Sequence, residues 1–142
     1  LTSFHFNFFS SIFQAVFVIF CVQILDFKPW ALSIVGIAGA VGGLSGAVAA
    51  STSFCSKNAK ILYAISITLP ALSIALMLFA QYSDSNNLRI GLVGLGEYVF
   101  GFCMVLCIVL FNTARQQCSP DSMVGSIAAT ERTVALGGEA LD

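Results

Sequence analysis

Long apolar runs alternate with short polar segments along this chain, and the charged residues mark the boundaries between the runs. We predict helices at about 6–25, 30–55, 61–82 and 90–114 because each run reaches the roughly 20 residues that a helix needs to cross a bilayer. Lipid offers the backbone no hydrogen-bonding partners, which favours helices over open strands. A fifth apolar segment, 126–142, is predicted to be a truncated helix.

The composition agrees with a membrane protein. Of the 142 residues, 58% are hydrophobic and only 9% are charged, and the mean hydropathy is +0.93. A soluble domain has about a quarter charged residues and could not bury this much apolar surface in one core. We therefore predict an all-α, polytopic transmembrane helix bundle in the plasma membrane, with the lipid bilayer as its main partner. The net charge of −1 argues against binding of nucleic acid.

The chain begins with Leu1 rather than Met, and it starts and stops within apolar segments. We therefore expect it to be a piece of a larger protein, with four complete membrane helices and the start of a fifth. No basic segment precedes the first apolar run, which argues against a signal peptide.

The basic residues divide unequally between the two ends of the predicted bundle. Four fall at one end, namely Lys57, Lys60, Arg115 and Arg132. Two fall at the other end, namely Lys28 and Arg89. Loops rich in Lys and Arg stay in the cytoplasm, so we predict that the end with four basic residues is cytoplasmic. The first helix would then run from inside to outside.

Small residues form a stripe on the second predicted helix. Gly39, Gly43 and Gly46 recur at spacings of three and four, and both Gly39/Gly43 and Gly42/Gly46 are GxxxG pairs. Such pairs let two helix backbones approach closely in lipid, where packing drives association. The favoured interpretation is a static helix–helix contact, and the alternative is a contact that slides during a transport cycle.

Glu97 is the one charged residue within the fourth apolar run, about seven residues and roughly 10 Å from its start. Burying a carboxylate there costs several kcal/mol unless it is paired, hydrated or protonated. An acid at this depth is a candidate proton carrier or cation partner, although it could also reach the wet loops. Asn7 and Gln14 share a face of the first helix, where they would form interhelical hydrogen bonds or line a cavity.

The sequence contains no pattern typical of an enzyme. Cys103 and Cys107 lie one helical turn apart, but no His or further Cys lies nearby, so packing is favoured over a metal pair. There is no Ser/His/Asp set, and the glycines of "VGGLSG" follow no predicted strand. We therefore expect neither a cofactor nor covalent catalysis.

The polar segment after the fourth run, "RQQCSPDSMVGSIAATER", contains an Arg-Gln pair, a Pro, a Gly, an Ala-Thr pair and a second Arg. These residues are Arg115, Gln116, Pro120, Gly125, Ala129, Thr130 and Arg132. The pattern resembles the cytoplasmic connection between the tenth and eleventh helices of major facilitator superfamily transporters, in the macrolide-efflux and siderophore-exporter-like branch. Ser126 departs from it, because that branch usually has Arg there. The glycine-rich second run resembles the eighth helix of the same family.

The resemblance implies the carboxyl-terminal half of a secondary transporter, covering helices seven to ten and the start of eleven. It implies proton-coupled efflux of small molecules by alternating access, with the missing amino-terminal half completing the path. Glu97, Asn7 and Gln14 would then line or approach that path. The cytoplasmic gate would contain Arg115, Gln116, Pro120, Gly125 and Arg132, as gating charges or as anchors that fix topology. The alternatives are a structural or receptor-like membrane subunit without transport, and a membrane-embedded enzyme.

Overall fold

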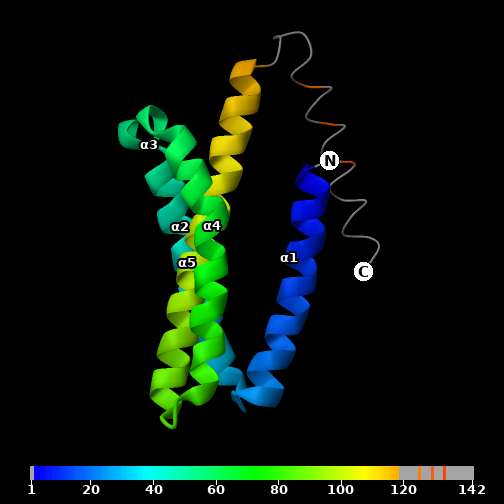
Figure 1. Ribbon diagram of the computed structural model, residues 1–142, viewed down its shortest axis with the longest axis vertical. Helices are drawn as coiled ribbons and strands as arrows, with labels where there is room; N and C mark the ends of the chain where they lie inside the picture. Colours follow the sequence, from blue (N-terminus) through cyan, green and yellow to red (C-terminus); the bar gives the residue numbers. More distant parts are fainter. Residues whose placement is uncertain (1, 119–124, 126–128, 130–132, 134–142) are drawn as a thin grey trace.

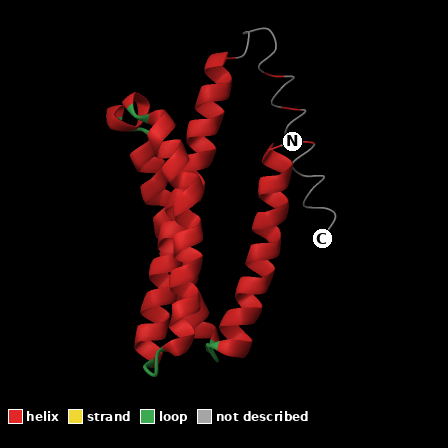
Figure 2. Ribbon diagram, in the orientation of Figure 1, coloured by secondary structure: helices red, strands yellow, loops and turns green. Residues whose placement is uncertain are grey.

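A computed structural model describes residues 2–118 together with 125, 129 and 133 (Figure 1). These residues form helices joined by short turns, and none of them forms a strand (Figure 2). Within this part of the chain, three helices are long and apolar enough to cross a membrane, namely Pro29–Ala50, Ala59–Tyr82 and Asn86–Ala114. The predicted all-α class is therefore confirmed for the described residues, and three of their helices have the length and apolar composition that a membrane span needs.

The elements follow one another in a simple order. They are α1 (Thr2–Ile19), the π-helical turn η1 (Phe20–Ile24), α2 (Pro29–Ala50), α3 (Ser53–Lys57), α4 (Ala59–Phe79), the 3₁₀ turn η2 (Ala80–Tyr82) and α5 (Asn86–Cys118). The sequence predicted four complete spans, whereas the apolar part of the first helix, Ser11–Ile24, is shorter than the other three. A fourth complete span thus stays a prediction.

Several helix boundaries differ from the prediction, among them those of α2 and α5. The second helix was expected to reach residue 55 but ends at Ala50. There, the hydroxyls of Ser51 and Thr52 donate to the carbonyls of Val48 and Ala49, each at 2.7 Å. Such local bonds give the backbone an alternative to further helix. The short helix α3 and the start of α4 follow.

The second difference concerns α5, which was expected to cover 90–114 but runs from Asn86 to Cys118. Hydropathy marks only the apolar middle of a helix, and the polar residues at both ends of α5 continue the same helix outside the apolar run. The predicted segment 126–142 lies almost entirely outside the described residues.

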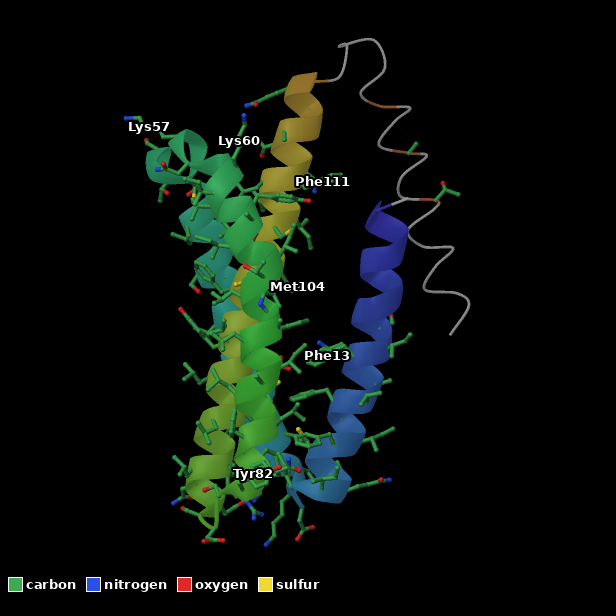
Figure 3. The ribbon with its side chains drawn as sticks, in the orientation of Figure 1. Phe13, Lys57, Lys60, Tyr82, Met104 and Phe111 are labelled. Carbon is green, nitrogen blue, oxygen red and sulfur yellow. The ribbon has the colours of Figure 1, made fainter. Side chains whose placement is uncertain are left out.

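Helix α5 is central to the bundle, because it packs against both α2 and α4 (Figure 1). α1 lies apart from these helices over most of its length and approaches them near η1 (Figure 1). Lys57 and Lys60 lie at one end of the bundle and Tyr82 at the other (Figure 3). Many large apolar side chains stay exposed on α2, including Ile37, Leu44 and Val48. In a membrane protein, such exposed apolar side chains are suited to contact with lipid.

The buried side chains form two clusters along α5. One lies near η1 and contains Cys21, Leu25, Val35 and Val93 among others. The other lies toward α3 and contains Cys55, Leu106 and Leu110. α5 therefore contributes to both clusters, which fixes the angular position of its side chains relative to α2 and α4.

Candidate functional site

Helices α2 and α5 meet backbone to backbone. A Cβ atom on Gly46 would lie 2.5 Å from the Phe102 carbonyl oxygen, closer than real Cβ atoms come to another atom. A Cβ on Gly42 would overlap the backbone of Tyr98 in the same way. From the opposite helix, a Cβ on Gly101 would overlap the carbonyl of Gly39. The absence of side chains at these positions is therefore what permits the contact, which we call the glycine seam (Gly39, Gly42, Gly43, Gly46 and Gly101).

The predicted packing residues Gly39, Gly43 and Gly46 differ in how much space a Cβ atom would have in the seam. A Cβ on Gly43 would lie 3.3 Å from Cγ2 of Val105, which a small shift could relieve, whereas Gly46 has no such freedom. Gly36, three residues before Gly39 on the same helix, has open space around it. The tightest contacts on α2 thus involve the second GxxxG pair, Gly42/Gly46.

A hydrogen bond also crosses the glycine seam. The hydroxyls of Ser45 and Tyr98 lie 3.0 Å apart. Because the Ser45 hydroxyl donates to the Gly42 carbonyl at 2.8 Å, its oxygen accepts from the Tyr98 hydroxyl. Sequence reasoning missed this pair, since a Ser and a Tyr on different helices give no signal without the register between them.

Glu97 lies on α5 at the edge of the glycine seam and is 8% exposed. Its Oε2 would lie 3.1 Å from a Cβ atom on Gly39, so the carboxyl fits where α2 lacks a side chain. Its Oε1 is buried and has no hydrogen-bond partner among the residues that the structure describes. A carboxylate oxygen in this position is costly to leave unpaired, and a proton on the carboxyl removes the charge.

Glu97 lies farther from the start of its helix than predicted. α5 begins at Asn86 rather than near residue 90, so Glu97 lies roughly 16 Å from the helix start at about 1.5 Å per residue. The earlier helix start leaves Glu97 closer to the middle of the membrane-spanning stretch Asn86–Ala114 than to its end. The added turn, Asn86–Arg89, is mostly polar, so Glu97 stays about seven residues inside the apolar run, as the sequence predicted.

The first helical segment borders the carboxyl from a third side. Cys21 of η1 is fully buried and lies near Glu97. One turn along α5, Phe100 contacts Phe13 of α1, with ring centroids 4.8 Å apart. Figure 3 shows Phe13 on the side of α1 that faces the bundle. The carboxyl of Glu97 therefore lies between the backbone of α2 at Gly39 and the α1–η1 segment.

The structure does not bring Gln14 to Glu97, because Gln14 is exposed. Phe13 and Phe17, spaced by four, occupy the face of α1 that packs on the bundle. Successive helix positions differ by about 100°, which turns residue 14 away from that face. The Asn7 side chain lies outside the described residues, so its place on the predicted path stays a prediction.

The predicted cytoplasmic gate falls mostly outside the described part of the chain. Pro120 and Arg132 lie there, as does Ser126, and the Arg115 side chain is not described. Gln116 is exposed at the end of α5, and Gly125 has open space around it. The gate therefore stays a prediction.

Helices α4 and α5 meet through a different small residue that sequence reasoning missed. A Cβ on Gly96 would lie 2.7 Å from Cγ of Met77 and 3.1 Å from the Ser73 carbonyl oxygen. Ser73 is fully buried, and its hydroxyl donates to the Pro70 carbonyl at 2.8 Å. Gly96 and Gly101 lie on two faces of α5, toward α4 and α2. This pattern in the sequence could have indicated that α5 is the central helix.

The described residues contain no group of three or more His, Cys, Asp and Glu side chains that could hold a metal ion. Cys103 and Cys107 are buried and are not disulfide-bonded. No protein-family model, curated protein or solved structure matches the chain. The residues around Glu97 are therefore the candidate functional site.

Proposed function

We propose that this chain is part of a secondary membrane transporter that exports small molecules in exchange for protons by alternating access. The observation that supports it is the buried carboxyl of Glu97, which has an unpartnered oxygen, at the edge of the glycine seam. Ionisable groups within membrane spans are rare, and they commonly belong to proton or ion pathways.

The surroundings of Glu97 suggest how a proton could affect conformation. A neutral carboxyl is compatible with the apolar contact between α2, α5 and the α1–η1 segment, whereas a charged one favours water or a cation. Loss of the proton would therefore favour a conformation in which this contact opens. Alternation between two such conformations is the behaviour expected of a rocking transporter.

The competing proposal is a structural or receptor-like membrane subunit. The tight backbone contact at Gly42 and Gly46 favours it, since a rigid glycine contact also suits a static bundle. The two proposals differ in one respect that can be measured. A static subunit has no reason to couple a proton gradient to solute movement.

The test is a flux assay with the full-length protein in proteoliposomes. A radiolabelled macrolide and a labelled siderophore serve as probes, and each is followed with and without a pH gradient. We expect wild-type protein to accumulate at least one probe against its gradient only when the pH gradient is present. Glu97→Gln, which keeps the size of the side chain but cannot exchange a proton, is expected to lose this accumulation.

Asp84→Asn serves as the matched control, since Asp84 is an exposed acid in the loop before α5. It should transport as wild type does. Normal gradient-driven transport by Glu97→Gln would remove Glu97 from the mechanism. Absence of gradient-driven transport of both probes by wild-type protein would favour the structural subunit.

A further inference from the structure

A pocket lies at the end of the bundle opposite Lys57 and Lys60, where η1 turns into α2 and where α5 begins. Its volume is about 310 Å³, and it is open on one side. Its lining residues are Leu25, Asp26, Lys28, Trp30, Asn86 and Arg89. The pocket is separate from Glu97, so its role does not depend on the proposed transport.

The turn between η1 and α2 brings the first four of these residues together. Asp26 has a φ of 54°, the one positive φ among the non-glycine residues that the structure describes. The Phe27 N–H donates to the Cys21 carbonyl at 3.0 Å, and Pro29 then starts α2. The chain therefore reverses over a few residues, which places the Asp26 and Lys28 side chains beside the start of α5.

Charges of both signs line the pocket without neutralising each other. Among the described residues, neither Lys28 nor Arg89 forms a salt bridge with Asp26, although all three line the same space. Arg89 donates from Nε to the Ser83 carbonyl at 2.7 Å, which fixes the side chain. Its two terminal NH₂ groups are not used in that bond and can bind a ligand.

The apolar part of the lining indicates the level of the membrane surface. Leu25 is 1% exposed and forms the closed side of the pocket, whereas Trp30 is 50% exposed at the start of α2. Trp residues at the ends of membrane helices lie at the level of the lipid headgroups. A ligand that enters this pocket therefore meets two cations and one carboxylate at headgroup depth.

We propose that the pocket binds the headgroup of a phospholipid that carries a primary ammonium, such as phosphatidylethanolamine. The phosphodiester accepts hydrogen bonds from the Lys28 ammonium and from the terminal NH₂ groups of Arg89. The lipid ammonium donates to the Asp26 carboxylate, and Trp30 contacts the glycerol region. This arrangement satisfies all three charges, whereas an anionic headgroup would leave Asp26 unpaired beside a second negative charge.

The test is native mass spectrometry of the delipidated full-length protein, mixed with equal amounts of phosphatidylethanolamine, phosphatidylglycerol and phosphatidylcholine of different acyl mass. We expect phosphatidylethanolamine to be retained about fivefold over the other two. Lys28→Gln should weaken its binding about fivefold, since a basic residue near the surface contributes about 1 kcal/mol. Lys60→Gln, at the opposite end of the bundle, is the matched control and should bind lipid as wild type does.

Asp26→Asn tests the contribution of the lipid ammonium to binding separately from that of the phosphate. Asn tolerates a left-handed backbone as Asp does, so the turn is preserved, and elution in gel filtration checks the fold of each variant. We expect it to abolish the preference for phosphatidylethanolamine over phosphatidylglycerol. Equal or stronger retention of phosphatidylglycerol by wild type would overturn the proposal, as would Lys28→Gln behaving like Lys60→Gln.

Inorganic phosphate tests whether the occupant is a lipid or a free anion. Inorganic phosphate is added alone to the delipidated wild-type protein and to Lys28→Gln. We expect the two proteins to show the same phosphate adducts. A phosphate adduct as sensitive to Lys28→Gln as the lipid would contradict a lipid occupant.

Discussion

Helix α5 contacts its neighbours in two different ways. Against α2, backbone meets backbone, because Gly42, Gly46 and Gly101 have no side chains to separate the helices. Against α1, the contact is made by large side chains, with the rings of Phe13 and Phe100 tilted at 32° to each other at a centroid distance of 4.8 Å. The first contact tolerates almost no added volume, whereas the second can change by rotation of side chains.

This difference suggests which parts of the molecule move. A contact between backbones has one well-packed arrangement, so α2 and α5 are expected to move as a unit. Aromatic rings can separate and re-form their contact at lower cost. We therefore expect α1 to be the element that shifts when the charge on Glu97 changes.

The largest effect is expected when side-chain volume is added to the glycine seam between α2 and α5. Gly46→Leu would place atoms within the position of the Phe102 backbone, and overpacking of this kind costs about 3 kcal/mol. Thermal unfolding in detergent should show a large loss of stability. Gly36→Leu is the matched control on the same helix, because Gly36 has open space around it, and it should leave stability nearly unchanged. Similar effects at both positions would contradict the seam.

A smaller effect is expected where α1 contacts the bundle. Phe13→Ala removes the ring contact with Phe100, which contributes about 1 kcal/mol beyond its buried area. Limited proteolysis should then cut near the α1–α2 turn faster, while α2 and α5 stay protected. A double-mutant cycle with Phe100→Ala measures the coupling between the rings. A coupling energy near zero would show that the rings do not hold α1 in place.

The smallest loss of stability is expected when the hydrogen bond across the glycine seam is removed. Tyr98→Phe removes the hydroxyl that donates to Ser45, while Ser45 keeps its bond to the Gly42 carbonyl. Hydrogen bonds between membrane helices contribute about 0.6 kcal/mol on average, so we expect a loss of that order in detergent unfolding. If Tyr98→Phe were as damaging as Gly46→Leu, polar bonding rather than backbone approach would hold α2 to α5.

The sequence predicted the helices and the packing stripe because both depend on local patterns. Long apolar runs indicate spans, and residues spaced by four share a helix face, as Gly42 and Gly46 do. It could not give the rotation of α1, which turns Gln14 outward. That rotation depends on contacts with Phe100, a residue far along the chain.

The same reasoning explains what was missed elsewhere. Lys28 and Arg89 are predicted to lie at one end because their loops alternate with the apolar runs, but only the turn at Asp26 brings them into one pocket. The start of α5 was predicted too late because the polar residues from Asn86 onward are helical too. In each case the missing information was the register between segments distant in sequence.

The most direct test of the central claim is difference infrared spectroscopy of the full-length protein in lipid as the pH is lowered. If Glu97 takes up a proton within the membrane, wild-type protein should gain the carbonyl band of a protonated carboxyl in an apolar environment. Glu97→Gln should lack that band, while Asp84→Asn should retain it. Identical spectra for wild type and Glu97→Gln would contradict the account, because the buried carboxyl would then exchange no proton.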